Sequence, residues 1–321
     1  MSPVISVVIP VGRVDDQLET QLAAVVAQQI EEPFEVILAC NTTDPAAAQR
    51  LRELASSIDA RPVHVAVATQ RRGASYARNA GAAMATGEIL AFCDSDDIAH
   101  TTWLAPLVAG LSSADAVGGR LVDFGLDERQ AKIRPPATPD ALPTFLGAPY
   151  IVSASMAIRR EVFEAAGGFD ETLIRCEDIA LSWALLGKGY RLVFAADSLM
   201  DYRHRPGLVP LLKQHYFYGR GMSQVLMRYG IPEPTPCDSA FVSTAEPAEQ
   251  AKRDLAEASG RTDPLRPMRG FTEPTGKGLL RPNSQSGGRR SLAGTLRRGS
   301  LAAGRVVGIV EERLRARRSR S

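Results

Sequence analysis

The sequence predicts an α/β fold in which helices cover both faces of a Rossmann-like, mostly parallel sheet. Short apolar runs alternate with amphipathic stretches, as in residues 4–9 followed by a helix with Leu18, Leu22, Val25 and Val26 on one side. The predicted strands are almost continuously apolar, which is typical of strands buried on both faces. Ligands of such sheets bind beyond the carboxyl ends of the strands.

The same pattern predicts each element in turn. We expect strands at residues 4–9, 34–40, 63–67, 88–93, 150–158 and 190–195, and helices at about residues 18–26, 46–58, 74–85, 161–166, 177–186 and 208–229. Residues 123–149 are rich in proline and charge, and their pattern assigns no element.

Composition divides the chain into three parts. Residues 1–230 carry the regular pattern and predict one domain that ends in a helical extension at about residues 206–230. Residues 231–290 are dominated by proline, serine, glycine and arginine, which predicts a disordered linker. Residues 291–321 regain helical spacing of apolar side chains among arginines and predict a basic amphipathic tail.

The formal net charge of +2 hides an asymmetry between the tail and the rest. From Arg281 to Ser321, eleven arginines face only Glu311 and Glu312, so this segment carries +9 and the other 280 residues carry −7. A basic amphipathic helix of this kind binds anionic lipid or a partner, and a frayed, solvated tail is the equal alternative. We expect no nucleic acid partner.

The sequence also predicts the compartment. It shows no signal peptide and no apolar run long enough to span a bilayer, and its four cysteines lack metal-ligand spacing. We therefore expect reduced thiols in a cytoplasmic protein, with the tail offering a peripheral position at the inner face of the cell membrane.

The sharpest local signal is the acidic turn Asp94-Ser95-Asp96-Asp97 after the strand that ends at Cys93. Three carboxylates so close together repel one another, and Mg²⁺ or Mn²⁺ would relieve that repulsion. Acids that cap a helix are the alternative explanation. Upstream, Arg72, Gly73 and Arg78 place a helix N-terminus and two guanidinium groups beside the turn, which suits a phosphate.

This stretch resembles the inverting glycosyltransferases of family 2, which have the GT-A fold. In that family a helix with glycine, serine, arginine, asparagine and glycine precedes an Asp-x-Asp turn and a Trp-Leu helix. The matching residues are Gly73, Ser75, Arg78, Asn79, Gly81, Asp94, Asp96, Trp103 and Leu104. The resemblance covers about residues 3–230, and the helical extension is similar to one that some bacterial relatives carry.

The resemblance implies a hexosyl-type transfer from a nucleotide-diphosphate sugar to a hydroxyl of a glycan, glycolipid or small molecule, as in cell-envelope assembly. It places the nucleotide against Pro10, Val11, Gly12, Asn41, Arg72, Gly73, Arg78, Asn79, Asp94 and Ser95. Asn41 stands where an aspartate is more common, and its amide can still pair with a base edge. A UDP-type donor is favoured.

The resemblance also implies the metal ligands and the base. Asp96 is the direct ligand of Mg²⁺ or Mn²⁺ with Asp94 nearby, and His204, or Tyr202 in its place, reaches the metal or the diphosphate. The base is Asp178, with Glu177 as the alternative, although a helix start is expected to lower the pKa of such a carboxylate. Ala180 departs from the family, which often has a third acid there.

Two other functions remain open from the sequence. A non-catalytic GT-A scaffold that binds a nucleotide or a partner is consistent with Asn41 and Ala180. A sugar nucleotidyltransferase would use a similar sheet and metal, but only Gly12-Arg13 represents its usual loop. A dinucleotide-dependent oxidoreductase is disfavoured because no G-x-G-x-x-G follows the first strand.

Overall fold

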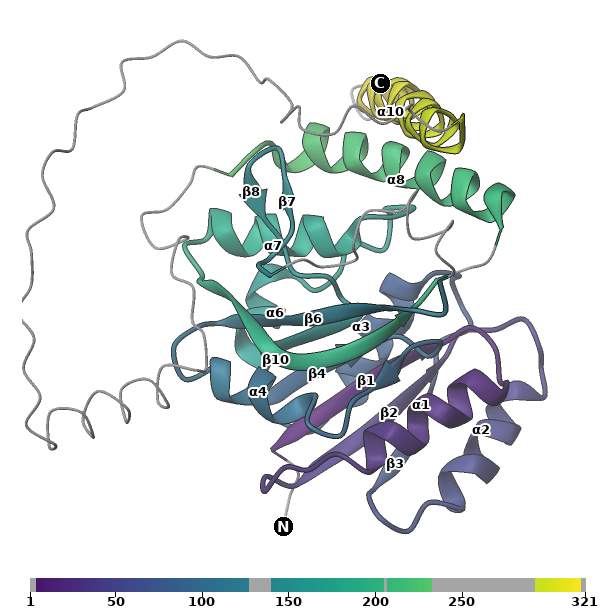
Figure 1. The fold of residues 1–321 in the computed structure, drawn as a ribbon, viewed down its shortest axis with the longest axis vertical. Helices are drawn as coiled ribbons and strands as arrows, with labels where there is room; N and C mark the ends of the chain where they lie inside the picture. The colour runs from purple at the N-terminus through teal and green to yellow at the C-terminus, as the bar shows by residue number, and fades with distance from the viewer. Residues whose placement is uncertain (1–3, 127–139, 205–206, 233–291, 319–321) are drawn as a thin grey trace, which may run out of the picture.

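The computed structural model describes residues 4–126, 140–204, 207–232 and 292–318. Within them, eight strands form one sheet in the order β3-β2-β1-β4-β9-β6-β10-β5 (Figure 1). Strands β9 and β5 are antiparallel to their neighbours and the other six are mutually parallel. The predicted mostly parallel α/β sheet is confirmed.

The sheet strands are β1 (Ile5–Val11), β2 (Phe34–Cys40), β3 (Val63–Val67), β4 (Ile89–Cys93), β5 (Ile98–Ala99), β6 (Ala116–Phe124), β9 (Ser155–Arg159) and β10 (Leu192–Arg203). A separate hairpin pairs β7 (Thr144–Phe145) with β8 (Ala148–Pro149). The helices are α1 (Asp16–Val26), α2 (Ala47–Ser56), α3 (Ala74–Met84), α4 (Leu104–Gly110), α6 (Arg160–Ala166), α7 (Glu177–Gly187), α8 (Leu208–Tyr229) and α10 (Leu292–Arg318).

Two apolar cores lie on opposite faces of the sheet. Strand side chains alternate between the faces, so Val7 and Ile9 of β1 join the core under α1, α2 and α4, whereas Val8 joins the core under α3, α6 and α7. Helix α3 packs very close to the sheet, because a Cβ on Gly81 would lie 2.4 Å from Val8 Cγ1. This approach fixes the N-terminus of α3 at the carboxyl edge of the strands.

Strand β6 was not predicted from the sequence. Gly118 and Gly119 weaken its strand pattern, yet the structure needs both: a Cβ on Gly119 would lie 2.1 Å from Ser155 Oγ, and one on Gly118 2.8 Å from Leu142 Cδ2. The glycines therefore let β9 and the loop before it pack against β6.

Two predicted strands have other bounds. The strand expected at residues 150–158 begins only at Ser155, because Ile151 N donates to Ser182 Oγ at 3.0 Å instead of joining the sheet. The strand expected at 190–195 runs on to Arg203 through an irregularity between Ala195 and Leu199.

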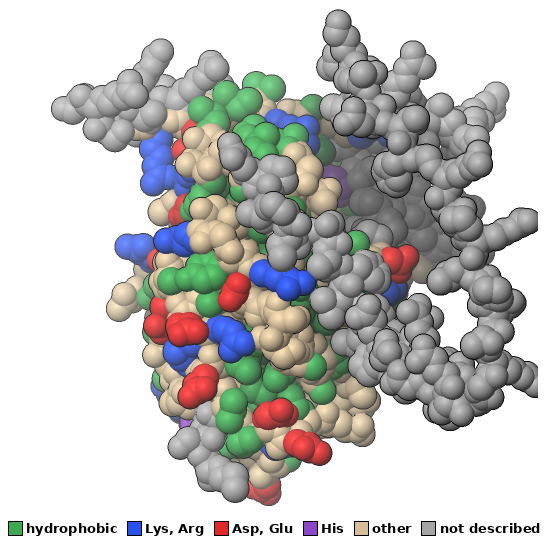
Figure 2. Space-filling model, turned by 90° about the vertical axis from the view of Figure 1, so that its left-hand side faces the viewer, with side chains coloured by type: hydrophobic (Ala, Val, Ile, Leu, Met, Phe, Trp, Pro, Cys, Tyr) green, Lys and Arg blue, Asp and Glu red, His purple; other side chains and the backbone are tan. Residues whose placement is uncertain are grey.

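Helices α8 and α10 form a further layer over α7 (Figure 1). Within the described residues, no helix is both long and apolar enough to span a bilayer. On the face drawn in Figure 2, acidic and basic side chains are interspersed, and hydrophobic side chains gather towards the end where α8 and α10 lie in Figure 1. The predicted linker lies outside the described residues, apart from residues 231 and 232.

Candidate active site

The turn after β4 brings three carboxylates together. Oxygen atoms of Asp94, Asp96 and Asp97 lie within 4.8 Å of one another. Asp97 is 1% exposed; its Oδ1 accepts from Arg203 N at 2.9 Å, and its Oδ2 is buried without a hydrogen-bond partner in the described part of the chain. A buried carboxylate oxygen without a donor, beside two more carboxylates, fits a divalent cation with oxygen ligands. The sequence predicted the cluster of three carboxylates but named only Asp96 and Asp94 of them as metal ligands.

Electrostatics support the same interpretation. Burial raises the pKa of Asp97 to about 9, and the nearby Asp94 adds to the shift. The charged form of Asp97 is therefore disfavoured while only its protein neighbours surround it, and a cation would reverse that preference.

Arg78 links this turn to the second half of the site. Its guanidinium is 3% exposed and donates to Asp94 Oδ1 at 2.5 Å and to Glu177 Oε1 at 2.9 Å. Burial alone would lower the pKa of Arg78, but Asp94 and Glu177 raise it, so the side chain stays charged. Arg78, which was predicted from the sequence to bind phosphate, thus holds the carboxylates of Asp94 and Glu177 in place.

The start of α7 carries the predicted base. Cys176 directly before it has a φ of 67°, which a residue other than glycine rarely adopts. The close packing of α8 stabilises this turn: a Cβ on Gly221 would lie 2.4 Å from Arg175 O. Glu177 and Asp178 follow, Glu177 turned to Arg78 and Asp178 accepting from Ile179 N at 2.9 Å.

Burial raises the pKa of Asp178 to about 7, and the adjacent Glu177 carboxylate contributes in the same direction. This corrects the expectation that the helix start lowers the pKa of this residue. The favourable field of α7 is outweighed because Asp178 is partly buried next to a second carboxylate. A carboxyl group with a pKa near neutrality suits a general base.

One cavity of about 990 Å³ joins these groups. Of the predicted site residues, the cavity is lined by Pro10, Val11, Gly12, Asn41, Gly73, Arg78, Asp94, Ser95, Asp96, Glu177, Asp178 and His204. Its lining comes from the carboxyl ends of β1, β2 and β4, from the N-termini of α3 and α7, and from α8. The topology thus brings together residues that lie far apart in the sequence.

Two predicted nucleotide contacts lie outside this lining. Arg72 is exposed. Asn79 instead holds the loop before α7: its Nδ2 donates to Phe169 O at 2.9 Å and to Glu171 Oε1 at 3.0 Å, and its Oδ1 accepts from Phe169 N at 3.0 Å. The structure gives Asn79 a supporting position.

Asn41 lines the cavity, but its amide is engaged by the loop before α3. Its Nδ2 donates to Ala68 O and, at 2.6 Å, to Arg71 O, while its Oδ1 accepts from Gly73 N at 3.0 Å. These bonds position Gly73 at the helix start.

His204 also lines the cavity, and its Nε2 lies 2.6 Å from Asp123 Oδ1. It does not belong to the group of potential metal ligands found among the described residues, which consists of the three aspartates. Tyr202 packs edge-on against the His204 ring, with the ring centroids 5.0 Å apart.

Several residues that line the cavity were not predicted from the sequence to belong to the site. Tyr150 falls in the predicted strand 150–158, Tyr218 in the predicted helix 208–229, and Leu301 in the tail. Alternation or helical spacing alone could not show that these side chains line one cavity.

A mostly parallel sheet whose carboxyl edge opens into a cavity lined by carboxylates and a helix N-terminus is typical of α/β enzymes that bind phosphate-containing ligands. The model of the family described as glycosyl transferase family 2 matches residues 6–167. The chain belongs to this family and is a glycosyltransferase with the GT-A fold.

Named relatives agree with this assignment. Glycosyltransferase AglE of Haloferax volcanii is 28% identical over 231 residues, which cover 70% of this chain and 75% of AglE. The pre-mycofactocin glycosyltransferase of Mycobacterium tuberculosis is 28% identical over 177 residues, 49% of this chain and 36% of that protein. The chain therefore spans little more than a third of the latter.

Solved structures share the fold. The mannosyltransferase PcManGT from Pyrobaculum calidifontis, in complex with GDP-Man and Mn²⁺, superposes with a TM-score of 0.56 at 19% identity over 82% of this chain and 77% of its own. S. aureus TarS 1–349 in complex with UDP-GlcNAc gives a TM-score of 0.50 at 19% identity, over 73% and 68% of the two chains.

Proposed function

We propose that this chain is an inverting glycosyltransferase that uses Asp178 as its general base. The acceptor hydroxyl oxygen bonds to the anomeric carbon of the donor while the bond from that carbon to the diphosphate breaks on the opposite face. Asp178 takes the hydroxyl proton as the new bond forms. The observation that carries this proposal is that Asp178, with a pKa of about 7, lines the same cavity as the aspartate turn.

The residues of the turn would hold a divalent cation, Mg²⁺ or Mn²⁺. Asp94, Asp96 and Asp97 supply the oxygens, and the unpartnered Oδ2 of Asp97 supports its inclusion. When bound, such an ion stabilises the charge that develops on the departing diphosphate. Arg78 orients Asp94 within this group.

The donor is proposed to be a UDP-type sugar held at Pro10, Val11, Gly12 and the N-terminus of α3, with its diphosphate near Asp94 and Ser95. One structure of similar fold contains UDP-GlcNAc and another GDP-Man. GDP therefore belongs in the same binding test.

The tail is proposed to meet an anionic membrane surface, which suits assembly of envelope glycans or glycolipids. Leu296, Val306 and Ile309 of α10 are 43%, 63% and 37% exposed, and Arg298 and Arg305 are exposed beside them. Apolar side chains flanked by arginines suit an interfacial helix. Val306→Asp should weaken sedimentation with phosphatidylglycerol vesicles; unchanged sedimentation refutes this role.

The test of the main proposal is thermal unfolding with UDP, GDP, nucleoside triphosphates and nucleotide sugars, each with Mn²⁺, Mg²⁺ or a chelator. We expect metal-dependent stabilisation by one nucleotide diphosphate, lost in Asp96→Ala and retained in Asp59→Ala, a change at an exposed aspartate. Release of nucleotide from the matching sugar should follow. Stabilisation by triphosphates with pyrophosphate release would indicate a nucleotidyltransferase, and no stabilisation would indicate a non-catalytic scaffold.

A further inference from the structure

Helix α10 is joined to the catalytic domain by a fitted interface rather than a loose contact. Three glycines let the two backbones approach: a Cβ would lie 1.9 Å from Tyr216 O if added to Gly304, 2.6 Å from Arg220 O if added to Gly308, and 2.1 Å from Leu301 O if added to Gly219. Any larger residue at these positions would separate α10 from α8.

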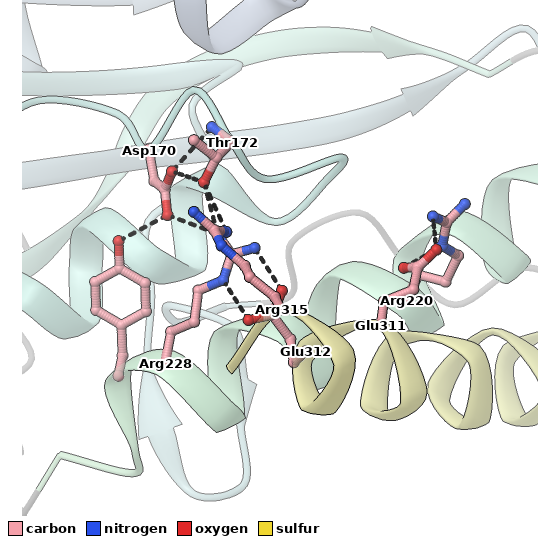
Figure 3. A network of polar contacts seen from close by, with 8 residues as sticks. Asp170, Thr172, Arg220, Arg228, Glu311, Glu312 and Arg315 are labelled. Carbon is pink, nitrogen blue, oxygen red and sulfur yellow. Dashed lines mark hydrogen bonds and ion pairs between the residues drawn. The ribbon is translucent and has the colours of Figure 1, made fainter. Parts of the chain in front are cut away.

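Charge pairing fixes the register of the same interface. Glu311 and Glu312, the only acids between residues 281 and 321, both pair with α8 (Figure 3). Glu311 binds Arg220 through both carboxylate oxygens, and Glu312 accepts from Arg228 at 2.6 and 3.0 Å. Two-pronged Arg–carboxylate pairs impose orientation as well as attraction.

The hydrogen-bond network continues from α10 towards α7, the helix that carries the proposed base. Arg228 also donates to Asp170 Oδ2 at 3.0 Å and to Thr172 Oγ1 at 2.7 Å (Figure 3). These two residues belong to the loop that leads to Glu177 and Asp178. Helix α10 is therefore connected through α8 to the segment that presents the proposed base.

This docking places Leu301 in the wall of the catalytic cavity. The lining includes Tyr150, Tyr218, Met222 and Leu301. Tyr150 and Tyr218 lie close to Asp178, and the backbone of Leu301 packs against Gly219, the neighbour of Tyr218. The polar side chains of α8 that share the wall bond within the helix: Gln214 Nε2 donates to Tyr218 Oη at 2.8 Å, and His215 Nδ1 lies 2.9 Å from Leu211 O. Tyr150, Tyr218, Met222 and Leu301 therefore present an aromatic and aliphatic patch in this wall, beside the polar side chains of Arg175, Gln214 and His215.

We propose that α10 completes the acceptor half of the cavity, and that this half binds an acceptor with an apolar group beside its reacting hydroxyl. The inference rests on the proposed function, because the base defines which half receives the acceptor. The donor half, in contrast, is lined by the aspartate turn, Arg78 and the N-terminus of α3.

Ligand-observed saturation-transfer NMR tests this with hexyl and methyl β-D-glucopyranoside, which differ only in the apolar chain. With the wild-type full chain, we expect strong saturation of the hexyl protons and weak saturation of the methyl glycoside. Leu301→Ser should weaken hexyl glycoside binding roughly fivefold, equivalent to about 1 kcal/mol, by removing apolar contact. Gly304→Val should displace α10 and reduce the hexyl signal at least as far.

Leu226→Ser is the matched control, because it makes the same change on α8 at a leucine that is 37% exposed and lies outside the cavity lining. It should leave the hexyl signal unchanged. Equal binding of the two glycosides to wild type, or an equal effect of Leu301→Ser and Leu226→Ser, overturns the inference.

Nucleotide binding with Mn²⁺ is measured on the same samples. If Leu301→Ser and Gly304→Val keep nucleotide binding but wild type does not distinguish the two glycosides, only the acceptor inference fails. If wild type binds no nucleotide, the proposed function fails first.

Discussion

Replacing Arg78 by methionine should destabilise the fold and disturb both halves of the site. Arg78 is 3% exposed and holds Asp94 at 2.5 Å and Glu177 at 2.9 Å. Methionine has a similar length without the charge, so the change leaves two carboxylates without their shared cation. Removing one partner of a buried ion pair costs ~3–5 kcal/mol.

For a domain of this size, ~1 kcal/mol corresponds to about 2–4 °C in Tm. Arg78→Met should therefore lower Tm by roughly 6–20 °C. Arg78→Lys keeps a charge but cannot form the fork to both carboxylates, so it should fall between methionine and wild type. The assay is thermal unfolding by circular dichroism at pH 7.5, with a chelator present.

Arg72→Met is the matched control, because Arg72 is exposed and lies six residues earlier in the chain. It should leave Tm within about 1 °C of wild type. Equal unfolding temperatures for the two methionine variants would refute the role assigned to Arg78.

Three further predictions follow from the site and the sheet. Asp178→Asn should lower kcat by about 10²–10⁴-fold. Because burial raises the pKa of Asp178 to about 7 and the base must be ionised, wild-type kcat/KM should fall tenfold per pH unit below pH 7 and level off above it. A flat profile of kcat/KM from pH 5 to 8 would contradict this role. Asn41→Asp, which restores the more common family residue, should lower the free energy of unfolding by ~2 kcal/mol, because carboxylate oxygens would face the carbonyls of Ala68 and Arg71. The same change should not tighten UDP binding. Tighter binding, measured by calorimetry, would show that residue 41 contacts the nucleotide base. Gly81→Val should lower the free energy of unfolding in urea by ~1–3 kcal/mol, because the new side chain overpacks against Val8. Gly187→Ala should be nearly neutral, because the space around Gly187 is open. A similar loss of stability in both variants would count against the close packing of α3.

The sequence predicted the strands β1, β2 and β4 and the aspartate turn well because local signals there agree with the tertiary structure. Strands β1, β2 and β4 are apolar almost throughout and are buried, and each helix between them shows regular apolar spacing. The turn after β4 gathers its acids within four residues, so their proximity needed no knowledge of the fold. Asp97 was not named as a metal ligand because the sequence alone does not show that its carboxylate is buried.

The part of the chain around β6 and the proposed base was predicted less well, because long-range contacts determine its structure. Strand β6 depends on glycines that make room for Ser155 and Leu142, and these glycines weaken the local strand pattern. Asn79 matched a family motif, but its bonds to Phe169 and Glu171 depend on residues ninety positions later. The pKa of Asp178 likewise depends on burial that a helix-start rule ignores.

The position of the antiparallel strand β9 has a consequence for folding. Strands β1, β2 and β3 pair with near neighbours in the chain, so this part can assemble early, whereas β4 joins β1 through the distant pair Ile5 and Ile89. Strand β9 lies between β4 and β6, although more than sixty residues separate it from β4 in sequence. Closing that long loop is slow. We therefore expect the sheet to close late at β4 and β9, so that the aspartate turn and the segment that carries the proposed base come together only in the last stages of folding.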